Sequence, residues 1–334
     1  MGDELLARAM ITRLRGLGAE PVVASRDPAA TSELHGVDAV PWGPRGLTAL
    51  ARIDGVCVGP GGILQDASSV WSLPGHLALA LLAQRRRVPV AAIGVGAEPL
   101  RRSSSARLLR RALGSGAVVT RDEASSAALR AAGVEVTTGV DVVFGLELPA
   151  SEPSGELVVS MGGSVRSGRV VPAGRRLDPP PLAEIAPAID RLAERLGARV
   201  VLTRFRGDRD ATAAIELAGM LRSETEVLSS DVDEHVRRVC GARLVLSSRY
   251  HPLVLAARAG VAAVAVSAQP KVRSLVGQID RPWVQIADSW AQIGEAAPES
   301  PGRGVVPVGL DPAHEALATL VVDAGAARAR RSLG

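Results

Sequence analysis

Short runs of aliphatic and β-branched residues alternate with longer stretches of helical periodicity along the whole chain. This alternation is typical of parallel sheets whose strands are joined by crossover helices. In the first half, we predict strands over residues 21–25, 55–58, 89–93, 117–120 and 135–138. The helices predicted there cover residues 5–15, 76–86, 104–113 and 123–132. The first half therefore has the pattern of a Rossmann-like α/β domain.

A polar stretch with proline and glycine, residues 147–155, interrupts the alternation. Beyond it we predict strands over residues 157–161, 199–203, 226–228, 243–247 and 262–266, and helices over 182–196, 210–221, 231–239 and 253–259. The long loop at 167–181 is of a kind that is often functional. We expect two Rossmann-like domains, the first over 1–147 and the second over 156–334, with a linker at 148–155 and a helix after Pro312.

Ligands of open parallel sheets bind beyond the carboxyl ends of the strands, so we expect the functional side chains there. In the first domain, these positions hold the loop from Gly59 to Asp66, the Gly94-Val95-Gly96 segment and the Arg121-Asp122 pair. In the second domain they hold Arg204, the segment Ser248-Arg249-Tyr250-His251, and Lys271. If the domains face each other, these loops line one cleft.

The amino-acid composition and charge indicate which kinds of binding partner to expect. Apolar residues make up 47% of the chain and aromatic residues 2%, and the pI is near 9.9 with a net charge of +4. Arginine runs at 85–87, 101–102 and 110–111 are spread over several predicted helices, which favours solvated helix faces. Interleaved aromatic residues for stacking bases are missing, so we expect no nucleic-acid partner. Lys271 is the only lysine among 39 cationic residues.

The chain has no apolar run of the roughly 18 residues that a membrane span requires. Cys57 and Cys240 are far apart in the sequence, and we expect both to be free thiols. We therefore expect a cytoplasmic protein, and we leave open a peripheral contact with the inner face of the membrane and the oligomeric state.

The sequence motifs of several common enzyme classes are absent. Lys271 is followed by valine, so the chain has no P-loop. Gly94-Val95-Gly96 lacks the third glycine of a dinucleotide fingerprint, and no G-x-S-x-G elbow is present. Histidines and cysteines are too few and too scattered for a zinc site. What remains is a set of Gly, Arg, Ser and Asp residues suited to anions and sugars.

In the first domain, the candidates lie in the loop after residue 58. Glycines Gly61 and Gly62 allow close approach of the backbone to a ligand. Gln65, Asp66, Ser68 and Ser69 offer hydrogen bonds to sugar hydroxyls. The alternative interpretation is a tight strand-to-helix turn with capping residues.

In the second domain, Arg249 and His251 stand where a strand ends and a helix begins. A guanidinium binds a carboxylate or phosphate bidentately, and an imidazole can transfer protons near neutral pH. Lys271 follows a strand that we expect to be adjacent. This trio predicts a site for an anionic substrate.

Four motifs, in this order, resemble those of the polysaccharide pyruvyl transferases. They are Gly61-Gly62-Ile63-Leu64-Gln65-Asp66, Arg121-Asp122-Glu123-Ala124-Ser125, Arg249-Tyr250-His251 and Pro270-Lys271-Val272. The resemblance implies a fold like the GT-B glycosyltransferases, phosphoenolpyruvate as the donor substrate, and no cofactor or required metal. It places Arg249 and His251 in the donor site. We add Arg204 and Lys271 to the donor site, and Gly61, Gly62, Gln65, Asp66, Arg121 and Asp122 to the acceptor side or cleft lining.

The expected reaction is the transfer of pyruvate as a ketal onto a sugar or lipid-linked glycan, in the synthesis of cell-surface polysaccharides. We expect His251 to protonate the methylene carbon of the donor, with Arg249 and Lys271 holding its phosphate and carboxylate. Asp66 and Asp122 both stay open as the base. The acceptor sugar, the hydroxyls that are joined and the stereochemistry stay open as well.

Two features depart from the family pattern. The segment after residue 161 lacks the Arg-Pro-Trp often found there, which makes Arg166 a weaker candidate. The family's Gly-Asp-Glu, which usually follows a strand and a loop, stands at residues 2–4. We therefore expect the first strand to be missing and the natural start to lie upstream.

Two other functions stay open. One is a GT-B glycosyltransferase that uses a nucleotide sugar. Retaining members carry glutamates near the donor, whereas residues 235–294 contain none. The other is a non-catalytic homologue that binds a sugar or an anion.

Overall fold

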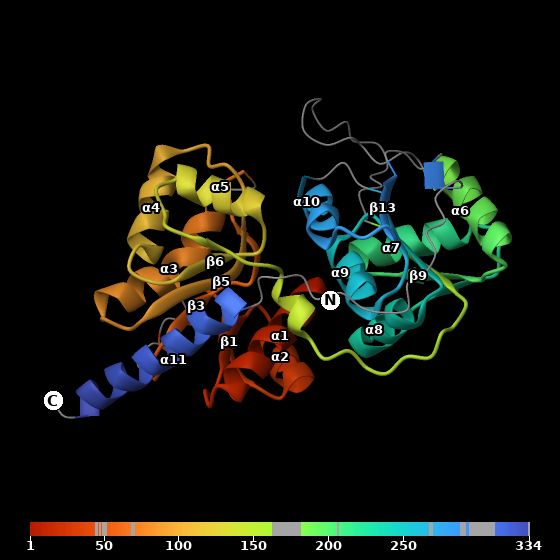
Figure 1. The fold of residues 1–334 in the computed structure, drawn as a ribbon. Coiled ribbons are helices and arrows are strands. Elements are labelled where there is room, and N and C mark those ends of the chain that lie inside the picture. Colours follow the sequence, from red (N-terminus) through yellow and green to blue (C-terminus); the bar gives the residue numbers. More distant parts are fainter. Residues whose placement is uncertain are drawn as a thin grey trace. The chain divides into compact units, whose positions relative to one another are not determined.

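The computed structural model describes residues 1–43, 46, 48, 52–67, 71–161, 182–205, 207–266, 270–287, 292–293 and 311–332. The chain divides into two compact units (Figure 1). The N-terminal unit comprises Leu5–Leu146 and Val308–Gly334, and the C-terminal unit comprises Met1–Glu4 and Glu147–Pro307. Each unit is an α/β structure with parallel strands, as predicted.

The strands described in the N-terminal unit form two sheets. The larger has the order β3(Val56–Val58)-β5(Val90–Ala97)-β6(Val118–Thr120)-β7(Thr137–Thr138), and β4(Gly61–Leu64) also pairs with β5. The strands β1(Val22–Ser25) and β2(Asp38–Pro41) form a separate parallel pair. Because β3 and β4 both pair with β5, the loop we expected at Gly61 and Gly62 begins as a strand.

The helices of this unit are α1(Gly2–Gly16), whose residues up to Glu4 belong to the C-terminal unit, α2(Pro28–His35), α3(Ser72–Arg85), α4(Ser103–Leu113), α5(Glu123–Ala131) and α11(Asp311–Ser332), and η2(Val142–Gly145) is a 3₁₀ turn. Apolar residues of α3 and α4, including Leu73, Leu77 and Leu109, are fully buried against β3, β4 and β5. Removing this apolar surface from water supplies the main stabilisation of the unit.

The C-terminal helix corrects the predicted domain boundary. We expected it to end the second domain, but α11 contacts β5 and β6 and belongs to the N-terminal unit. The apolar residues Ala313, Leu317 and Leu320 are buried. We assigned the helix to the second domain because it follows that domain in the sequence. Periodicity shows which face of a helix is apolar but not which sheet covers that face.

In the C-terminal unit, the described residues form a parallel sheet of six strands. Its order is β10(Thr225–Val227)-β9(Val200–Thr203)-β8(Leu157–Ser160)-β11(Leu244–Ser247)-β12(Ala263–Val266)-β13(Val284–Ala287). The chain builds outward from β8 in one direction and then, from β11, in the other. This is the doubly wound order of dinucleotide-binding folds, with its switch point between β8 and β11.

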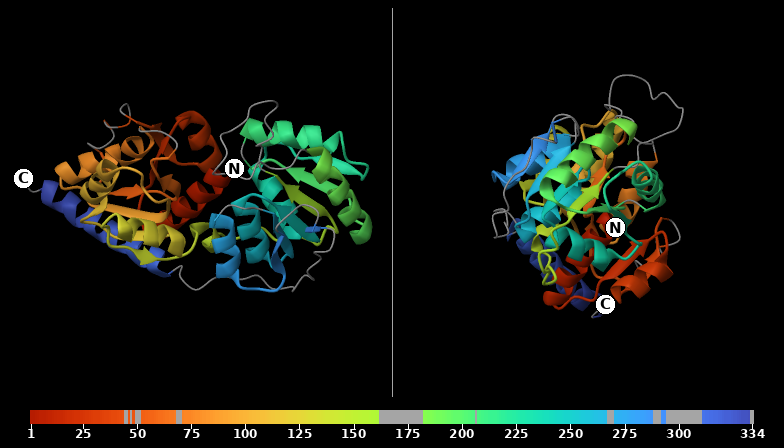
Figure 2. Two further views of the ribbon diagram at one scale, coloured as in Figure 1. Left: turned by 90° about the horizontal axis from the view of Figure 1, so that it is seen from above. Right: turned by 90° about the vertical axis from the view of Figure 1, so that its right-hand side faces the viewer.

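Helices cover both faces of this sheet. They are α6(Leu182–Leu196), α7(Gly207–Ala218), α8(Val232–Gly241), α9(Tyr250–Ala259) and α10(Pro270–Ile279). Helices α6 and α7 pack together on one face, and α8, α9 and α10 form a contiguous group on the other (Figure 2). Strands buried on both faces explain the continuous aliphatic runs in the sequence.

The predicted linker at 148–155 lies outside helices and strands. The loop predicted at 167–181, Arg166, Ser68 and Ser69 lie outside the described residues. Within the described residues, no helix is long and apolar enough to span a membrane.

Candidate functional site

The switch point of the C-terminal sheet holds a tightly bonded turn. The backbone N–H of Ser248 donates to the carbonyl of Ser160 at 3.0 Å, and the Ser247 hydroxyl lies 3.2 Å from the same carbonyl. Ser247 Oγ also accepts the N–H of Arg249 at 2.9 Å. These bonds fix where the chain leaves β11, and α9 begins at the next residue but one after Ser248. Ligands of doubly wound sheets bind at this point.

Arg249 stands at the start of α9 and is held by a buried carboxylate. Its Nε donates to Asp210 Oδ2 at 3.1 Å, and its Nη2 donates to Asp210 Oδ1. The Asp210 side chain is fully buried in α7, whereas 21% of the Arg249 side chain is exposed. The guanidinium fork that we expected to grip the donor therefore binds a carboxylate of the protein. Arg249 contributes a fixed positive charge at the switch point.

His251 and Lys271 occupy the first turns of neighbouring helices. His251 is half-buried in α9 and packs edge-on against Tyr250, with ring centroids 5.4 Å apart. Lys271 is exposed at the start of α10. Because β11 pairs with β12, the helices that follow these strands start at the same edge of the sheet. This confirms the expected adjacency of the two strands, and helix N-termini favour anions.

Arg204 follows β9, two strands away from β11. Its backbone N–H donates to Nε2 of His235 at 3.2 Å, and its Nε donates to the carbonyl of Ser229 at 2.7 Å. The Arg204 side chain is thus tied to the β10–α8 connection. Its charge still lies at the carboxyl edge of the sheet.

His235 was not predicted as a site residue. It is fully buried in α8, and its Nδ1 lies 2.7 Å from the carbonyl of Asp231. A backbone N–H can only donate, so Nε2 accepts from Arg204 and Nδ1 carries the proton. Burial lowers the pKa of His235 and outweighs the opposite effects of Asp231 and Glu234. A polar residue on the apolar face of a predicted helix was the sequence signal for such a buried anchor.

In the N-terminal unit, the Asp66 carboxylate binds the segment that leads into α4. Its carboxylate accepts the backbone N–H groups of Arg101 and Arg102 at 3.0 and 3.1 Å and the hydroxyl of Ser105 at 2.8 Å. Burial alone would raise the pKa of Asp66, but these bonds and the charge of Arg102 outweigh it and lower the pKa. Asp66 therefore holds the start of α4 and not that of α3, the helix that follows its own loop.

Gln65 has a similar local role. Its Oε1 accepts the backbone N–H of Ala67 at 2.8 Å, which shapes the turn after β4. Asp122 is the N-cap of α5, because its Oδ1 accepts the N–H of Ser125 at 2.7 Å. Both candidate bases, Asp66 and Asp122, therefore accept backbone hydrogen bonds that stabilise the fold.

Arg121 is the buried cation of the N-terminal unit's carboxyl edge. Its guanidinium lies 3.4 Å from Asp122 Oδ2 and 3.9 Å from Asp141 Oδ2, and only 9% of its side chain is exposed. A Cβ at Gly96 would lie 2.8 Å from Arg121 Nη2, and one at Gly62 would lie 3.4 Å away. The glycines of β4 and β5 thus make room for this guanidinium.

The structure therefore groups the predicted site residues by unit. Arg249, His251 and Lys271 gather at one edge of the C-terminal sheet, with Arg204 two strands away. Gly61, Gly62, Gln65, Asp66, Arg121 and Asp122 gather at the carboxyl edge of the N-terminal sheet. Among the described residues, no group of three or more His, Cys, Asp or Glu side chains is placed to hold a metal ion.

Solved structures that resemble this chain include UDP-GlcNAc 2-epimerases. The chain superposes on S. aureus MnaA with UDP at a TM-score of 0.60 and 12% identity, covering 93% of this chain and 92% of that one. UDP-GlcNAc 2-epimerases from Neisseria meningitidis and Methanocaldococcus jannaschii also match at TM-scores of 0.60 and 12% identity, with 96% and 95% of this chain and 96% of each of theirs covered. These similarities show a GT-B-like fold.

Among curated proteins, none matches the sequence. The family model for polysaccharide pyruvyl transferase matches residues 1–270, a span that contains most of both units and all the motifs identified above except the end of Pro270-Lys271-Val272. The chain therefore belongs to the polysaccharide pyruvyl transferase family.

Proposed function

We propose that this protein transfers pyruvate from phosphoenolpyruvate to a sugar or glycan acceptor and forms a cyclic ketal. The observation that carries the proposal is the placement of Arg249, His251 and Lys271 at the switch-point edge of the C-terminal sheet. Two cations and one imidazole at helix starts suit a small donor with a phosphate and a carboxylate.

The cations have separate roles in this proposal. Arg249 is fixed by Asp210, so its charge is in place before the donor binds. Lys271 is exposed and carries a compact, rotatable ammonium that can follow the phosphate as it leaves. Preorganised charges stabilise a transition state most, because they need no rearrangement during the reaction.

His251 supplies the proton in the first step. Its imidazolium protonates the methylene carbon of phosphoenolpyruvate, which becomes a methyl group and leaves the central carbon electrophilic. One acceptor hydroxyl adds to that carbon and gives up its proton, and the C–O bond to phosphate then breaks. A second hydroxyl adds and closes the ketal, and the products are the ketal and inorganic phosphate.

The proposal assigns no base to Asp66 or Asp122. Both carboxylates accept backbone N–H groups at helix starts, and this use accounts for their burial. One of the two hydroxyl protons returns to His251, and the other leaves with the phosphate. The imidazole thus ends the cycle in its starting protonation state.

A glycosyltransferase or epimerase that uses a nucleotide sugar is the second candidate, because similar solved structures include one complex with UDP and one with UDP-GlcNAc. Two observations weigh against it. Residues 235–294 contain no glutamate that could face such a donor. Sequence identities near 12% indicate a shared fold but do not indicate a shared substrate.

Thermal unfolding with each ligand distinguishes the two candidates. A ligand that binds only the native state raises the melting temperature by mass action. Phosphoenolpyruvate should raise it, whereas UDP-GlcNAc at the same concentration should not. The opposite order would replace the pyruvyl transferase with a nucleotide-sugar enzyme.

A further inference from the structure

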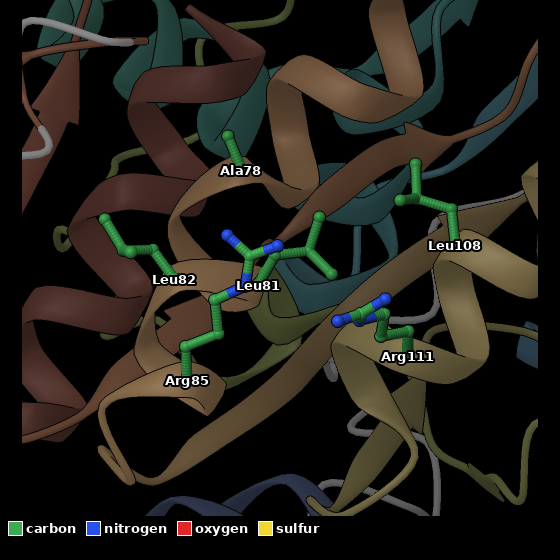
Figure 3. Close-up of a pocket in the computed structure, with 6 residues that line it drawn as sticks. All are labelled: Ala78, Leu81, Leu82, Arg85, Leu108 and Arg111. Carbon is green, nitrogen blue, oxygen red and sulfur yellow. The ribbon is translucent and has the colours of Figure 1, made fainter.

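A groove runs between α3 and α4 on the surface of the N-terminal unit (Figure 3). Its volume is about 320 Å³, and its lining residues are Ala78, Leu81, Leu82, Arg85, Leu108 and Arg111. Four of these side chains are apolar, two are guanidinium groups and none is acidic. The groove is distinct from every residue that the proposed reaction uses.

Two of the arginine runs, 85–87 and 110–111, lie at the C-terminal ends of two helices that pack against each other. The run at 85–87 ends α3, the pair at 101–102 precedes α4, and the pair at 110–111 ends α4. Helices α3 and α4 pack against each other, and all these arginines are exposed. With Arg107, they make eight arginines between residues 67 and 120, where Glu98 is the only carboxylate.

Arg85 and Arg111 stand on the two walls of the groove. Figure 3 shows their guanidinium groups reaching toward the space between α3 and α4. Other arginines of the cluster have partners: Arg102 bonds to Asp66, and Arg110 donates to the carbonyl of Ala132 at 2.7 Å. No carboxylate in the described part of the chain pairs with Arg85 or Arg111. Two like charges beside one groove favour an anion between them.

The leucines on the groove floor favour a ligand that also contains hydrocarbon. Leu81, Leu82 and Leu108 are only half-buried, so the floor of the groove is apolar surface that water still reaches. Such surface is stabilised when hydrocarbon covers it. An anionic group joined to a hydrocarbon chain satisfies both the arginines and the leucines.

Trp71 extends this face of α3. Positions 71, 78 and 85 are seven residues apart, so they line up along one side of the helix. The Trp71 side chain is 78% exposed, the highest value among the large hydrophobic residues that the structure describes. Tryptophan is enriched at the headgroup level of membranes, where its ring meets both water and hydrocarbon.

We propose that the α3–α4 surface, defined as Trp71, Leu81, Leu82, Arg85, Leu108 and Arg111, docks on an anionic lipid membrane. Arg85 and Arg111 contact lipid phosphates, and the leucines and Trp71 contact the upper part of the acyl chains. This binding is peripheral and separate from pyruvyl transfer. A nucleic-acid partner fits less well, because leucines and not stacked aromatic rings line the groove.

Sedimentation of the full chain with vesicles tests the proposal. We expect binding to vesicles of equal parts phosphatidylcholine and phosphatidylglycerol, weakening in high salt, and none to phosphatidylcholine alone. The double variant Arg85→Gln/Arg111→Gln should lower the partition coefficient about 30-fold, given the usual contribution of each basic residue at an anionic membrane.

A matched control removes the same charge elsewhere. Arg191 on α6 and Arg237 on α8 are exposed arginines of the C-terminal unit, so Arg191→Gln/Arg237→Gln should keep wild-type binding. Equal losses in both double variants would overturn the docking surface, because binding would then follow net charge alone.

The apolar part of the proposal has its own variant. Leu108→Gln keeps every charge and should still weaken vesicle binding several-fold. Unchanged binding in this variant would contradict contact between the groove and the acyl chains. Binding to a single-stranded oligonucleotide with no binding to anionic vesicles would overturn the lipid assignment in favour of nucleic acid.

Discussion

At the scale of single residues, the carboxylate that holds Arg249 is the most informative finding. Bidentate bonding to Asp210 turns a flexible side chain into a fixed charge. The sequence placed Arg249 in the donor site but gave no sign of Asp210, because the two residues are 39 positions apart. Buried pairs of this kind are costly to break, since removing one partner leaves an uncompensated charge.

The substitution Asp210→Asn tests this arrangement. It keeps the shape of the side chain but removes the charge, so Arg249 loses its anchor. We expect the affinity for phosphoenolpyruvate to fall by about tenfold or more, because misplaced charges stabilise an anion poorly. Titration calorimetry measures the change.

A matched control is Asp190→Asn. Asp190 is another buried carboxylate, which accepts N–H groups of Arg222 and Ser223 away from β11. This variant should be destabilised without a change in donor affinity. A loss of affinity in both variants would show that general destabilisation, and not the anchor, is being measured.

His251 carries the chemical step in this account. His251→Ala should leave the fold and the binding of phosphoenolpyruvate nearly unchanged and lower turnover by roughly 10²-fold or more. The split between binding and turnover is the expected signature of a proton donor. Turnover at the wild-type rate in His251→Ala would remove this histidine from the mechanism.

At the scale of helices and strands, His235 joins the segment after β9, which carries Arg204, to the start of α8. It receives the N–H of Arg204 from the end of β9 and donates to Asp231 at the start of α8. Because burial lowers the pKa of His235 below its ordinary value near 6.5, the folded protein favours the neutral ring. The unfolded chain then binds more protons at His235 than the folded protein does. The contribution of His235 to stability is therefore complete above its ordinary pKa and declines as the pH falls below that pKa.

Chemical denaturation of wild type and His235→Gln between pH 7 and 5 measures this effect, in the range where histidines titrate. The wild type should lose stability more steeply on acidification than the variant. At pH 7 the variant should be less stable by about 1–3 kcal/mol, because buried hydrogen bonds are lost. His76, whose pKa burial and Arg26 also lower, is the same in both proteins and cancels. Parallel pH profiles would contradict a neutral His235.

The sequence predicted elements well where local signals were strong. Aliphatic runs bounded by glycine or proline became β1, β3, β6 and the central strands of the C-terminal sheet. The structure adds α2, β2, β4, α10 and β13 to the predicted elements. Of these, α2 had a complete signal, with Asp27 as N-cap, a proline at its start and Gly36 at its end. The glycines of β4 obscured its pairing with β5.

The candidate site was predictable in part. Arg249, His251 and Lys271 could be placed together because each follows a predicted strand, and the adjacency of β11 and β12 confirmed this. The structural roles of Asp66 and Asp122 were not predicted, although helix capping was one interpretation of the loop that ends at Asp66. Capping and catalysis draw on the same residue types, so only the hydrogen-bond partners separate them.

At the scale of the whole molecule, both units are Rossmann-like and the fold is GT-B-like, as the sequence implied. The strand order of the C-terminal sheet defines the switch point, and Arg249 and His251 follow β11 there. Strand order is a tertiary property that periodicity alone does not specify. The assignment of α11 to the N-terminal unit was likewise beyond the sequence pattern.

The central claim is that the C-terminal site transfers pyruvate from phosphoenolpyruvate to a glycan. The most direct test incubates the purified protein with phosphoenolpyruvate and a panel of glycan acceptors, and measures both inorganic phosphate and acceptor mass. The account predicts phosphate release that depends on an acceptor, with one acceptor gaining the mass of pyruvic acid less one water. Acceptor mass that stays unchanged with phosphoenolpyruvate but increases by a sugar unit with UDP-sugars would contradict it.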